Sequence, residues 1–123
     1  MPLSHQDIEA RIKAYVDAFN SGDAGAVADL FAPDGLLEDP VGGASARGRD
    51  DIAAFYTRSI GMGAKLHLVA PITSAADTGA FAFYASVGDM RIDVIELQHF
   101  NVDGKITHMK AYFSNENMHK IGA

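Results

Sequence analysis

Residues 90–100 read MRIDVIELQHF, and they follow the dipeptide Gly88-Asp89. A Gly-Asp pair between two apolar runs rich in β-branched and aromatic residues is typical of a β-hairpin. The other arm of this hairpin is expected at 79–87, and two further strands are expected at 65–72 and 105–113. The second half of the chain therefore predicts a meander of strands in one sheet.

The first half of the chain predicts helices. Five apolar residues at helical spacing form one stripe: Ile8, Ile12, Tyr15, Val16 and Phe19. Ser4 is the expected N-cap of this first helix. A short second helix is expected over 24–31, and a third is expected to begin at Asp50 or Asp51 and to end at 61–63.

The connection between the second and third helices is expected to be mostly irregular. Residues 33–35 (Pro-Asp-Gly) predict a turn, residues 36–39 a short extended piece and residues 41–48 a loop. Helices followed by a run of strands are typical of an α+β fold. The whole chain, 1–123, is therefore expected to form one α+β domain, in which a curved antiparallel sheet packs its concave face against three helices.

Charge and composition exclude several classes of function. The 123 residues carry 10 basic and 16 acidic side chains, a net charge of −6, and 48% of the residues are apolar. Scattered basic residues in an acidic chain argue against nucleic-acid binding. No apolar run approaches the roughly 20 residues of a membrane span. The N-terminus also lacks a basic stretch followed by an apolar one, so no signal peptide is expected.

The chain has no cysteine. Disulfides, thiolate metal sites and thiol nucleophiles are thereby excluded, and a reducing, cytoplasmic compartment is the expected location. The histidines do not have the spacing of a zinc motif, so no metal is expected. His99 and His108 are expected to face each other across the last two strands.

Strand parity singles out Glu96 as a candidate functional residue. Within 90–100, the side chains of Ile92, Val94 and Glu96 alternate onto one face of the strand. If that face is the core face, Glu96 lies in an apolar wall, where a lone carboxyl tends to become protonated. A neutral carboxylic acid could donate a hydrogen bond to an oxyanion. The pattern alone also allows an exposed Glu96, or one paired with a lysine.

Asp39 and Tyr15 are two further candidates. Asp39 lies in an extended, apolar segment closed by Pro40, and at the mouth of a cavity it could act as a general base. The alternative is a solvated carboxylate before a turn. Tyr15 lies on the apolar stripe of the first helix, and the hydroxyl of Tyr56 could be its hydrogen-bond partner. Both tyrosines could equally be core residues.

Several segments together resemble the Δ5-3-ketosteroid isomerases. They run in order along nearly the whole chain: 14–16 (AYV) with 20–23 (NSGD), 37–42 (LEDPVG), 53–56 (AAFY), 93–96 (DVIE) and 109–113 (MKAYF). The Glu-Asp-Pro segment, together with the upstream tyrosine and the last strand, is the most specific part. The resemblance implies the cone-shaped α+β fold of nuclear transport factor 2-like and SnoaL-like proteins. It also implies a homodimer.

The resemblance further implies a role for each matching residue. Asp39 would be the catalytic base, and Tyr15 and Glu96 would donate hydrogen bonds to the oxyanion formed from a steroid substrate, with Tyr56 bonded to Tyr15. The family usually has an aspartate where this chain has Glu96, which is one methylene longer. No metal and no organic cofactor is implied. The residues expected to bind the substrate are Phe55, Tyr56, Phe83, Met109 and Phe113.

Two other interpretations are compatible with the same fold. One is a cyclase, a dehydratase or an epoxide hydrolase that acts on another apolar substrate. An epoxide hydrolase would need an arginine deep in the pocket, and the arginines between residues 47 and 91 are not placed where one is expected. The other is a non-catalytic module that binds small apolar ligands. The presence of both Asp39 and Tyr15 favours an enzyme. Five phenylalanines could line its pocket or simply fill the core: Phe55, Phe81, Phe83, Phe100 and Phe113.

Overall fold

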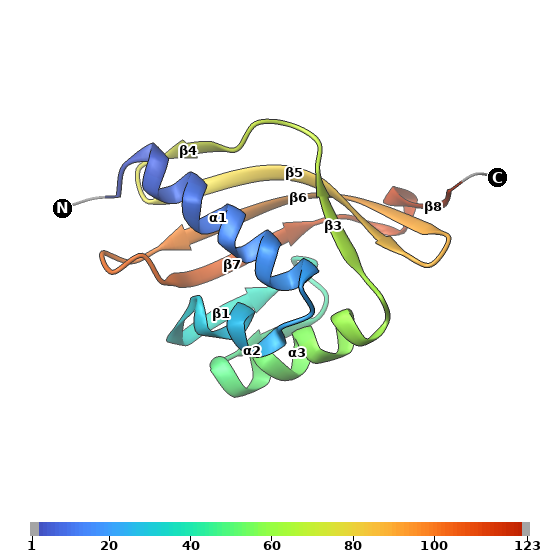
Figure 1. The fold of residues 1–123 in the computed structure, drawn as a ribbon, viewed down its shortest axis with the longest axis horizontal. Helices are drawn as coiled ribbons and strands as arrows, with labels where there is room; N and C mark the ends of the chain where they lie inside the picture. The colour runs from blue at the N-terminus through green and yellow to red at the C-terminus, as the bar shows by residue number, and fades with distance from the viewer. Residues whose placement is uncertain (1–2, 122–123) are drawn as a thin grey trace.

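Three helices lie on one face of a curved eight-stranded sheet in the computed structural model, which describes residues 3–121 (Figure 1). The helices are α1 (His5–Asn20), α2 (Ala24–Asp29) and α3 (Arg49–Gly61). The strands are β1 (Phe31–Glu38), β2 (Ser45–Arg47), β3 (Lys65–Leu68), β4 (Thr73–Ala75), β5 (Thr78–Val87), β6 (Met90–Phe100), β7 (Ile106–Tyr112) and β8 (Met118–Lys120), with a 3₁₀ turn at Asn115–Asn117. This is the predicted α+β architecture. Met1 and Pro2, the start of the N-terminus considered for a signal peptide, lie outside the described residues.

The sheet is mixed rather than wholly antiparallel. Its hydrogen-bonded order is β2-β1-β7-β6-β5-β3, with β4 added to β5 and β8 added to β6. The hairpin predicted around Gly88-Asp89 joins β5 to β6, which pair antiparallel along their whole length. β1, however, runs parallel to β7, so the expectation of an antiparallel sheet is wrong at this pair. The two strands are far apart in the chain, and no hairpin sets their relative direction.

Several element boundaries differ from the prediction. The strand expected over 65–72 ends early, and the separate strand β4 follows Pro71, whose ring nitrogen cannot donate a ladder hydrogen bond. The turn expected at 33–35 lies within β1, where the pairing with β7 changes register. The loop expected at 41–48 contains the short strand β2, which pairs with β1. The second helix ends at Asp29, and β8 has no counterpart in the prediction.

The apolar stripe of α1 faces the sheet and is buried as predicted: Ile8, Ile12, Tyr15, Val16 and Phe19. Ser4 caps the helix, and its side chain and backbone exchange hydrogen bonds with Asp7. The sheet approaches this helix closely at Gly79 of β5, where a Cβ atom would collide with Ile8 and Ile12. A glycine at position 79 therefore permits the contact between α1 and the sheet.

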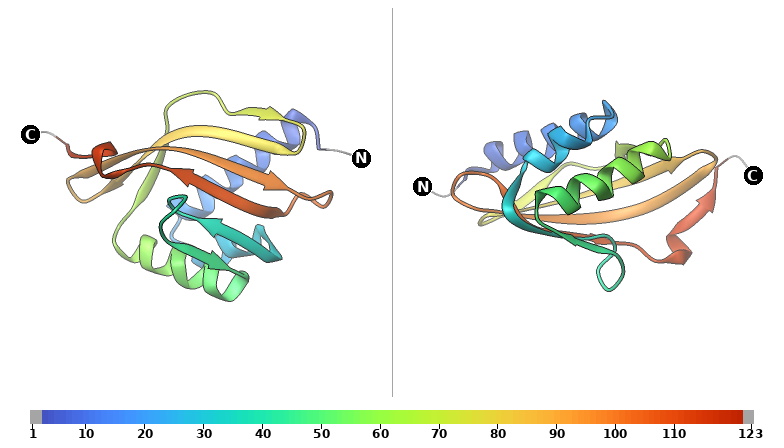
Figure 2. Two further views of the ribbon diagram at one scale, coloured as in Figure 1. Left: turned by 180° about the vertical axis from the view of Figure 1, so that it is seen from behind. Right: turned by 90° about the horizontal axis from the view of Figure 1, so that it is seen from below.

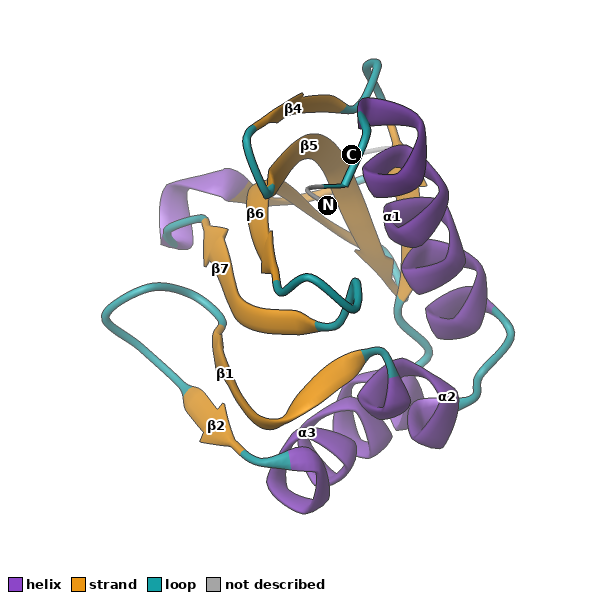
Figure 3. Ribbon diagram, turned by 90° about the vertical axis from the view of Figure 1, so that its left-hand side faces the viewer, coloured by secondary structure: helices purple, strands orange, loops and turns teal. Residues whose placement is uncertain are grey.

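The strand β6 presents alternating faces, as its sequence predicts. Val94, Glu96, Gln98 and Phe100 are buried on the inner face, whereas Ile95 is exposed on the outer face. Figure 2 shows the helices together on one side of the sheet, and Figure 3 shows the strands curving around an interior that the helices close off. The inner face of β6 therefore faces the space between the sheet and the helices.

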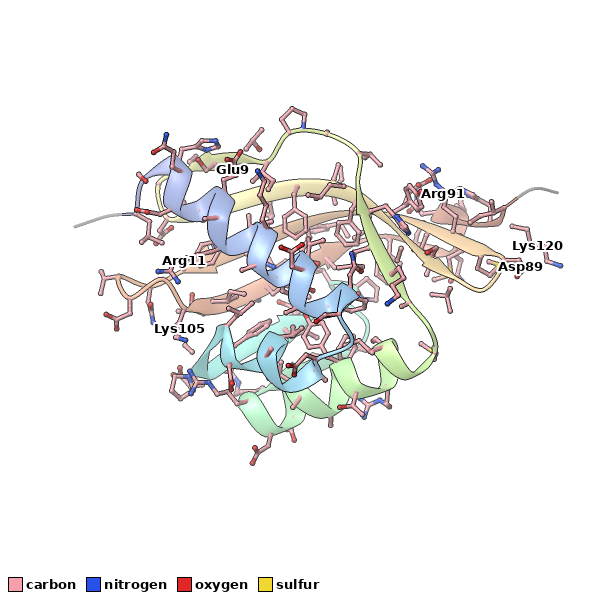
Figure 4. All side chains as sticks on the ribbon, in the orientation of Figure 1. Glu9, Arg11, Asp89, Arg91, Lys105 and Lys120 are labelled. Carbon is pink, nitrogen blue, oxygen red and sulfur yellow. The ribbon has the colours of Figure 1, made fainter. Side chains whose placement is uncertain are left out.

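Several charged side chains lie on the outside of this arrangement. Arg11, Arg91, Lys105 and Lys120 are found at the edges of the fold (Figure 4). Arg11 also makes a structural contact, because its Nη1 donates a hydrogen bond to the carbonyl oxygen of Gly104 at 3.0 Å. Among the helices within residues 3–121, none is long and apolar enough to cross a membrane.

Candidate active site

The space between the helices and the inner face of the sheet contains a cavity of about 270 Å³. Its polar groups come from different elements: Tyr15 from α1, Tyr56 and Ser59 from α3, Asp39 from the end of β1, and Glu96 from β6. Most of the wall is apolar and includes Phe19, Phe55, Phe83, Val94, Phe113 and Met118. An apolar cavity with a few convergent polar groups is the usual form of a small-molecule site. The three residues expected to be catalytic border this one cavity.

Asp39 lies where the chain leaves β1. Its backbone N–H donates to the carbonyl oxygen of Ala44, and the N–H of Val41 donates to the carbonyl oxygen of Ala111 on β7, both at 2.9 Å. These bonds hold the turn against β7, beside the cavity. Burial raises the pKa of the Asp39 carboxyl from 3.8 to about 6. The group is therefore ionised at neutral pH and more basic than an ordinary aspartate, so it is not the freely solvated carboxylate of the alternative interpretation.

Glu96 is buried on the inner face of β6, with 1% of its surface exposed. Its Oε2 accepts a hydrogen bond from Nε2 of Gln98 at 2.8 Å. Burial raises the pKa of Glu96 well above its ordinary value, the negative charge of Asp39 raises it further, and the hydrogen bond from Gln98 opposes these effects. These surroundings therefore favour the neutral carboxylic acid, which can donate a hydrogen bond, and the exposed alternative is excluded.

Tyr15 and Tyr56 form a buried hydrogen-bonded pair. Their hydroxyl oxygens lie 2.7 Å apart, and their rings pack edge to face with centroids 5.9 Å apart. Tyr56 is thus the partner expected for Tyr15. Burial raises the pKa of both hydroxyls well above the ordinary value for tyrosine. Both side chains therefore keep their protons, and each can serve as a hydrogen-bond donor.

Four of the five expected substrate-binding residues border the cavity: Phe55, Tyr56, Phe83 and Phe113. Met109 does not border it and is a fully buried core residue. The residue of β7 that pairs with Glu96 is Ala111, and Met109 lies further along the strand, opposite Gln98. Phe81 and Phe100 are also core residues rather than wall residues.

Three residues of interest were not expected at the site. Phe19 borders the cavity from the apolar stripe of α1, where nothing distinguishes it from its core neighbours. Met118 lies in β8, a strand of three residues that is too short to show alternation. Gln98 bonds to Glu96, and its position on the same face of β6 follows from strand parity alone.

The histidines described by the structure lie away from the cavity. His99 and His108 face each other across β6 and β7 as predicted, with ring centroids 5.9 Å apart. Nε2 of His108 lies 2.6 Å from Oε1 of Glu38, and Nδ1 of His99 lies 2.8 Å from Oγ1 of Thr78. Within residues 3–121, no three His, Asp or Glu side chains gather as metal ligands would.

The cavity combines an ionised base with neutral hydrogen-bond donors. A carboxylate of this kind can take a proton from a carbon atom next to a carbonyl group. Neutral donors can then stabilise the negative charge that develops on the carbonyl oxygen. The apolar wall keeps the local dielectric low, which strengthens such hydrogen bonds. The arrangement is therefore suited to enolate chemistry on a small apolar ketone.

Comparison with known proteins places the chain in a family. Residues 12–109 match the SnoaL-like domain. The chain is also 35% identical over 116 residues to a protein of Nocardioides simplex named Steroid Delta-isomerase, and the alignment covers 91% of this chain and 94% of that protein. The span that matches the domain includes Tyr15, Asp39 and Glu96. This chain is therefore a member of the SnoaL-like family, within the nuclear transport factor 2-like α+β fold.

Proposed function

We propose that the protein is a steroid Δ-isomerase that converts 3-oxo-Δ5-steroids into 3-oxo-Δ4-steroids. The observation that carries the proposal is the meeting of an ionised base, Asp39, with two neutral donors, Tyr15 and Glu96, at one apolar cavity. The name of the Nocardioides simplex relative supports the same reaction. A steroid is flat and apolar and has few polar atoms, which suits a cavity with this lining.

The reaction moves one proton between two carbon atoms of the substrate. The Asp39 carboxylate takes a proton from C4, the C–H electrons form a C3–C4 double bond, and the C3 carbonyl becomes an enolate oxygen. The resulting dienolate then takes the proton back from Asp39 at C6. The carbonyl re-forms, and the double bond now lies between C4 and C5. Asp39 ends the cycle ionised, so the reaction consumes no oxidant and needs no metal or organic cofactor.

Tyr15 and Glu96 stabilise the dienolate by donating hydrogen bonds to its C3 oxygen. Donors that are already in place act most strongly where charge develops in a site with little water. Glu96 must be neutral for this role, because a second negative charge would repel the oxyanion. Burial keeps Glu96 protonated, while Asp39 stays ionised at neutral pH. The two carboxyl groups thus have opposite protonation states and opposite tasks.

The cavity lining gives no support to an epoxide hydrolase. That reaction requires an arginine among carboxylates deep in the pocket to activate water. Among the described residues, no arginine borders the cavity. The isomerase needs no such group, because its proton donor and proton acceptor are the same carboxyl.

We also propose that the protein is a homodimer that pairs through the outer face of the sheet. Ile95 of β6 and Tyr112 of β7 are paired neighbours there, with 57% and 46% of their surfaces exposed. They line a hollow together with Val69, which is 55% exposed, and with the charged residues Arg91 and Asp93. Apolar side chains gathered on an outer face are typical of an interface, and the face opposite the cavity leaves the site open.

The proposed activity is tested with 5-androstene-3,17-dione as substrate. The conjugated 4-ene-3-one product absorbs ultraviolet light that the substrate does not, so the reaction can be followed directly. We expect a fast rise in absorbance with the wild-type protein. Asp39→Asn, which cannot accept the proton, should lower kcat by up to about 10⁴-fold while the circular dichroism spectrum stays the same.

Absence of any rise with correctly folded wild-type protein would contradict the proposal. A screen of other apolar ketones and of epoxides would then show whether the same cavity acts on a different substrate. A rise that Asp39→Asn leaves unchanged would contradict the role of Asp39 as the base.

A further inference from the structure

Gln98 is a buried polar residue that the proposed mechanism does not use. It lies two residues after Glu96 on the inner face of β6, and none of its surface is exposed. Its neighbours across the sheet are Gly79 on β5 and Met109 on β7. Neither neighbour offers a strong hydrogen-bonding side chain. An amide buried in such a layer costs free energy unless its own hydrogen bonds are satisfied.

The amide of Gln98 is only half satisfied. Its Nε2 donates to Oε2 of Glu96 at 2.8 Å. Its Oε1 has no hydrogen-bond partner within residues 3–121. A methionine of nearly the same length would fill the same space without an unpaired oxygen. The bond to Glu96 is therefore what distinguishes a glutamine from an apolar residue at this position.

This bond also decides which oxygen of Glu96 carries the proton. A neutral carboxyl has one carbonyl oxygen, which accepts, and one hydroxyl, which donates. Oε2 accepts a hydrogen bond from the side-chain N–H of Gln98, so Oε2 is the carbonyl oxygen of the neutral carboxyl. Oε1 is then the hydroxyl. Glu96 borders the cavity and Gln98 does not, so the oxygen that is not bonded to Gln98 is the one available to a ligand.

We propose that Gln98 is a positioning residue, whose amide fixes the orientation of the Glu96 carboxyl and keeps its hydroxyl for a ligand in the cavity. The inference rests on the proposed role of Glu96 as a donor in the isomerase. A glutamate side chain has several rotatable bonds, so without a partner its carboxyl samples several orientations. Gln98, which does not border the cavity, removes that freedom through its bond to Glu96.

The opposite orientation of the amide would have the opposite effect. If Gln98 were turned so that its Oε1 accepted the Glu96 proton, the hydroxyl would point away from the ligand. Removing the amide would then release the donor and speed the reaction. In the arrangement described here, removing the amide frees the carboxyl to rotate and slows the reaction. The two cases are therefore separated by the sign of one change.

The first test is spectroscopic and does not depend on turnover. Gln98→Met removes the amide and keeps the length of the side chain, and Phe100→Leu, at a buried β6 position off the cavity, controls for a disturbed core. Infrared difference spectroscopy detects the C=O stretch of the protonated carboxyl, which is assigned to Glu96 by its loss in Glu96→Gln. We expect Gln98→Met to move this band to higher wavenumber, because its carbonyl oxygen loses a hydrogen bond. We expect Phe100→Leu to leave the band in place.

An unmoved C=O band in Gln98→Met would overturn the inference.

The second test is a double-mutant cycle on the isomerase rate. Gln98→Met should lower kcat about 10-fold and change KM less than about 2-fold, as expected when one hydrogen bond that acts on the transition state is lost. Combined with Glu96→Ala, which leaves no carboxyl to orient, the same substitution should not lower kcat further. An equal loss in that background, or a faster Gln98→Met enzyme, would overturn the inference. A shifted infrared band in a protein with no isomerase activity would instead reject the proposed function and support only the hydrogen bond between Gln98 and Glu96.

Discussion

The hydroxyl oxygen of Tyr56 on α3 lies 2.7 Å from that of Tyr15 on α1, so one hydrogen bond joins two helices beside the cavity. Each hydroxyl has a single proton to donate. In the proposed reaction Tyr15 donates its proton to the substrate oxygen, so it can only accept from Tyr56. The two tyrosines then form a short chain in which Tyr56 orients Tyr15 and strengthens its donation.

Tyr56→Phe removes this second hydroxyl and keeps the ring. We expect kcat to fall about 3- to 10-fold, because a neutral hydrogen bond contributes about 1 kcal/mol. Tyr15→Phe removes the donor itself and should lower kcat about 10²- to 10³-fold. Steady-state kinetics measure both, and thermal unfolding checks that each variant is folded. Equal losses in the two variants would contradict the proposed order of the hydrogen bonds, in which Tyr56 donates to Tyr15 and Tyr15 donates to the substrate.

The pH profile should report the ionisation of Asp39. Burial raises the pKa of this carboxyl to about 6, and only the ionised form can take a proton. We expect kcat/KM to be constant at high pH, to fall through a midpoint near pH 6, and to drop about 10-fold per pH unit below it. Initial rates at substrate concentrations well below KM give the profile. A midpoint near pH 4, where a solvated aspartate titrates, would show that Asp39 is not buried in the working enzyme.

Much of the fold could be predicted because it depends on local pattern. The buried stripe of α1 follows from the spacing of its apolar residues, and the inner face of β6 follows from alternation. The turn at Gly88-Asp89 pairs β5 with β6 without further information. The parallel pairing of β1 with β7 could not be predicted in this way, because it joins segments that only the tertiary fold brings together.

The features of the candidate site also divide into those that local sequence pattern predicts and those that only the tertiary fold determines. The buried position of Glu96 follows from strand parity once the inner face of β6 is known. The cavity itself depends on register between strands, which decides that Ala111 rather than Met109 pairs with Glu96. Met118 reaches the cavity from a strand too short to have a pattern of its own. Residue type and resemblance therefore predicted the polar residues that border the cavity better than the apolar residues of its wall.

Glu96 and Asp39 should differ in how much activity their loss removes. Glu96→Ala leaves Tyr15 as the remaining donor, so we expect kcat to fall about 10²-fold, the lower end for an oxyanion-hole donor. Asp39→Asn removes the base and should cost up to about 10⁴-fold. Glu96→Gln keeps an N–H donor at the same position and should recover part of the loss. No change of rate in Glu96→Ala would exclude Glu96 from the reaction.

The outer face of the sheet should control the oligomeric state. Ile95→Arg places a charge in the exposed apolar patch of Ile95, Tyr112 and Val69. A buried, unpaired charge is strongly unfavourable in an interface, so we expect the dimer to dissociate. Light scattering coupled to size exclusion measures the mass directly. Val102→Arg, at a residue that is 76% exposed in a loop, is the matched control and should leave the dimer intact. A dimeric Ile95→Arg protein would show that the interface lies elsewhere.

The raised pKa of Asp39 also has a consequence for stability. Burial raises the pKa from 3.8 to about 6 in the folded protein, so the carboxyl loses its proton more easily in the unfolded chain. The contribution of Asp39 to stability is fully present below about pH 4 and is lost as the pH rises through 6. The shift corresponds to a penalty of at most about 3 kcal/mol at pH 8. The ionised Asp39 carboxylate therefore lowers the stability of the folded protein at neutral and alkaline pH.

Asp39→Asn removes the charge, and it should raise the free energy of unfolding at pH 8 by up to about 3 kcal/mol while changing it far less at pH 4. Urea unfolding at the two pH values measures the difference. Asp34→Asn, which alters an exposed carboxylate of β1, controls for the loss of a negative charge. An equal gain at both pH values would point to packing of the amide instead. No gain in the free energy of unfolding at pH 8 would mean that the ionised Asp39 carboxylate is well solvated in the folded protein. A midpoint near pH 6 in the rate profile would then have to come from another titrating group.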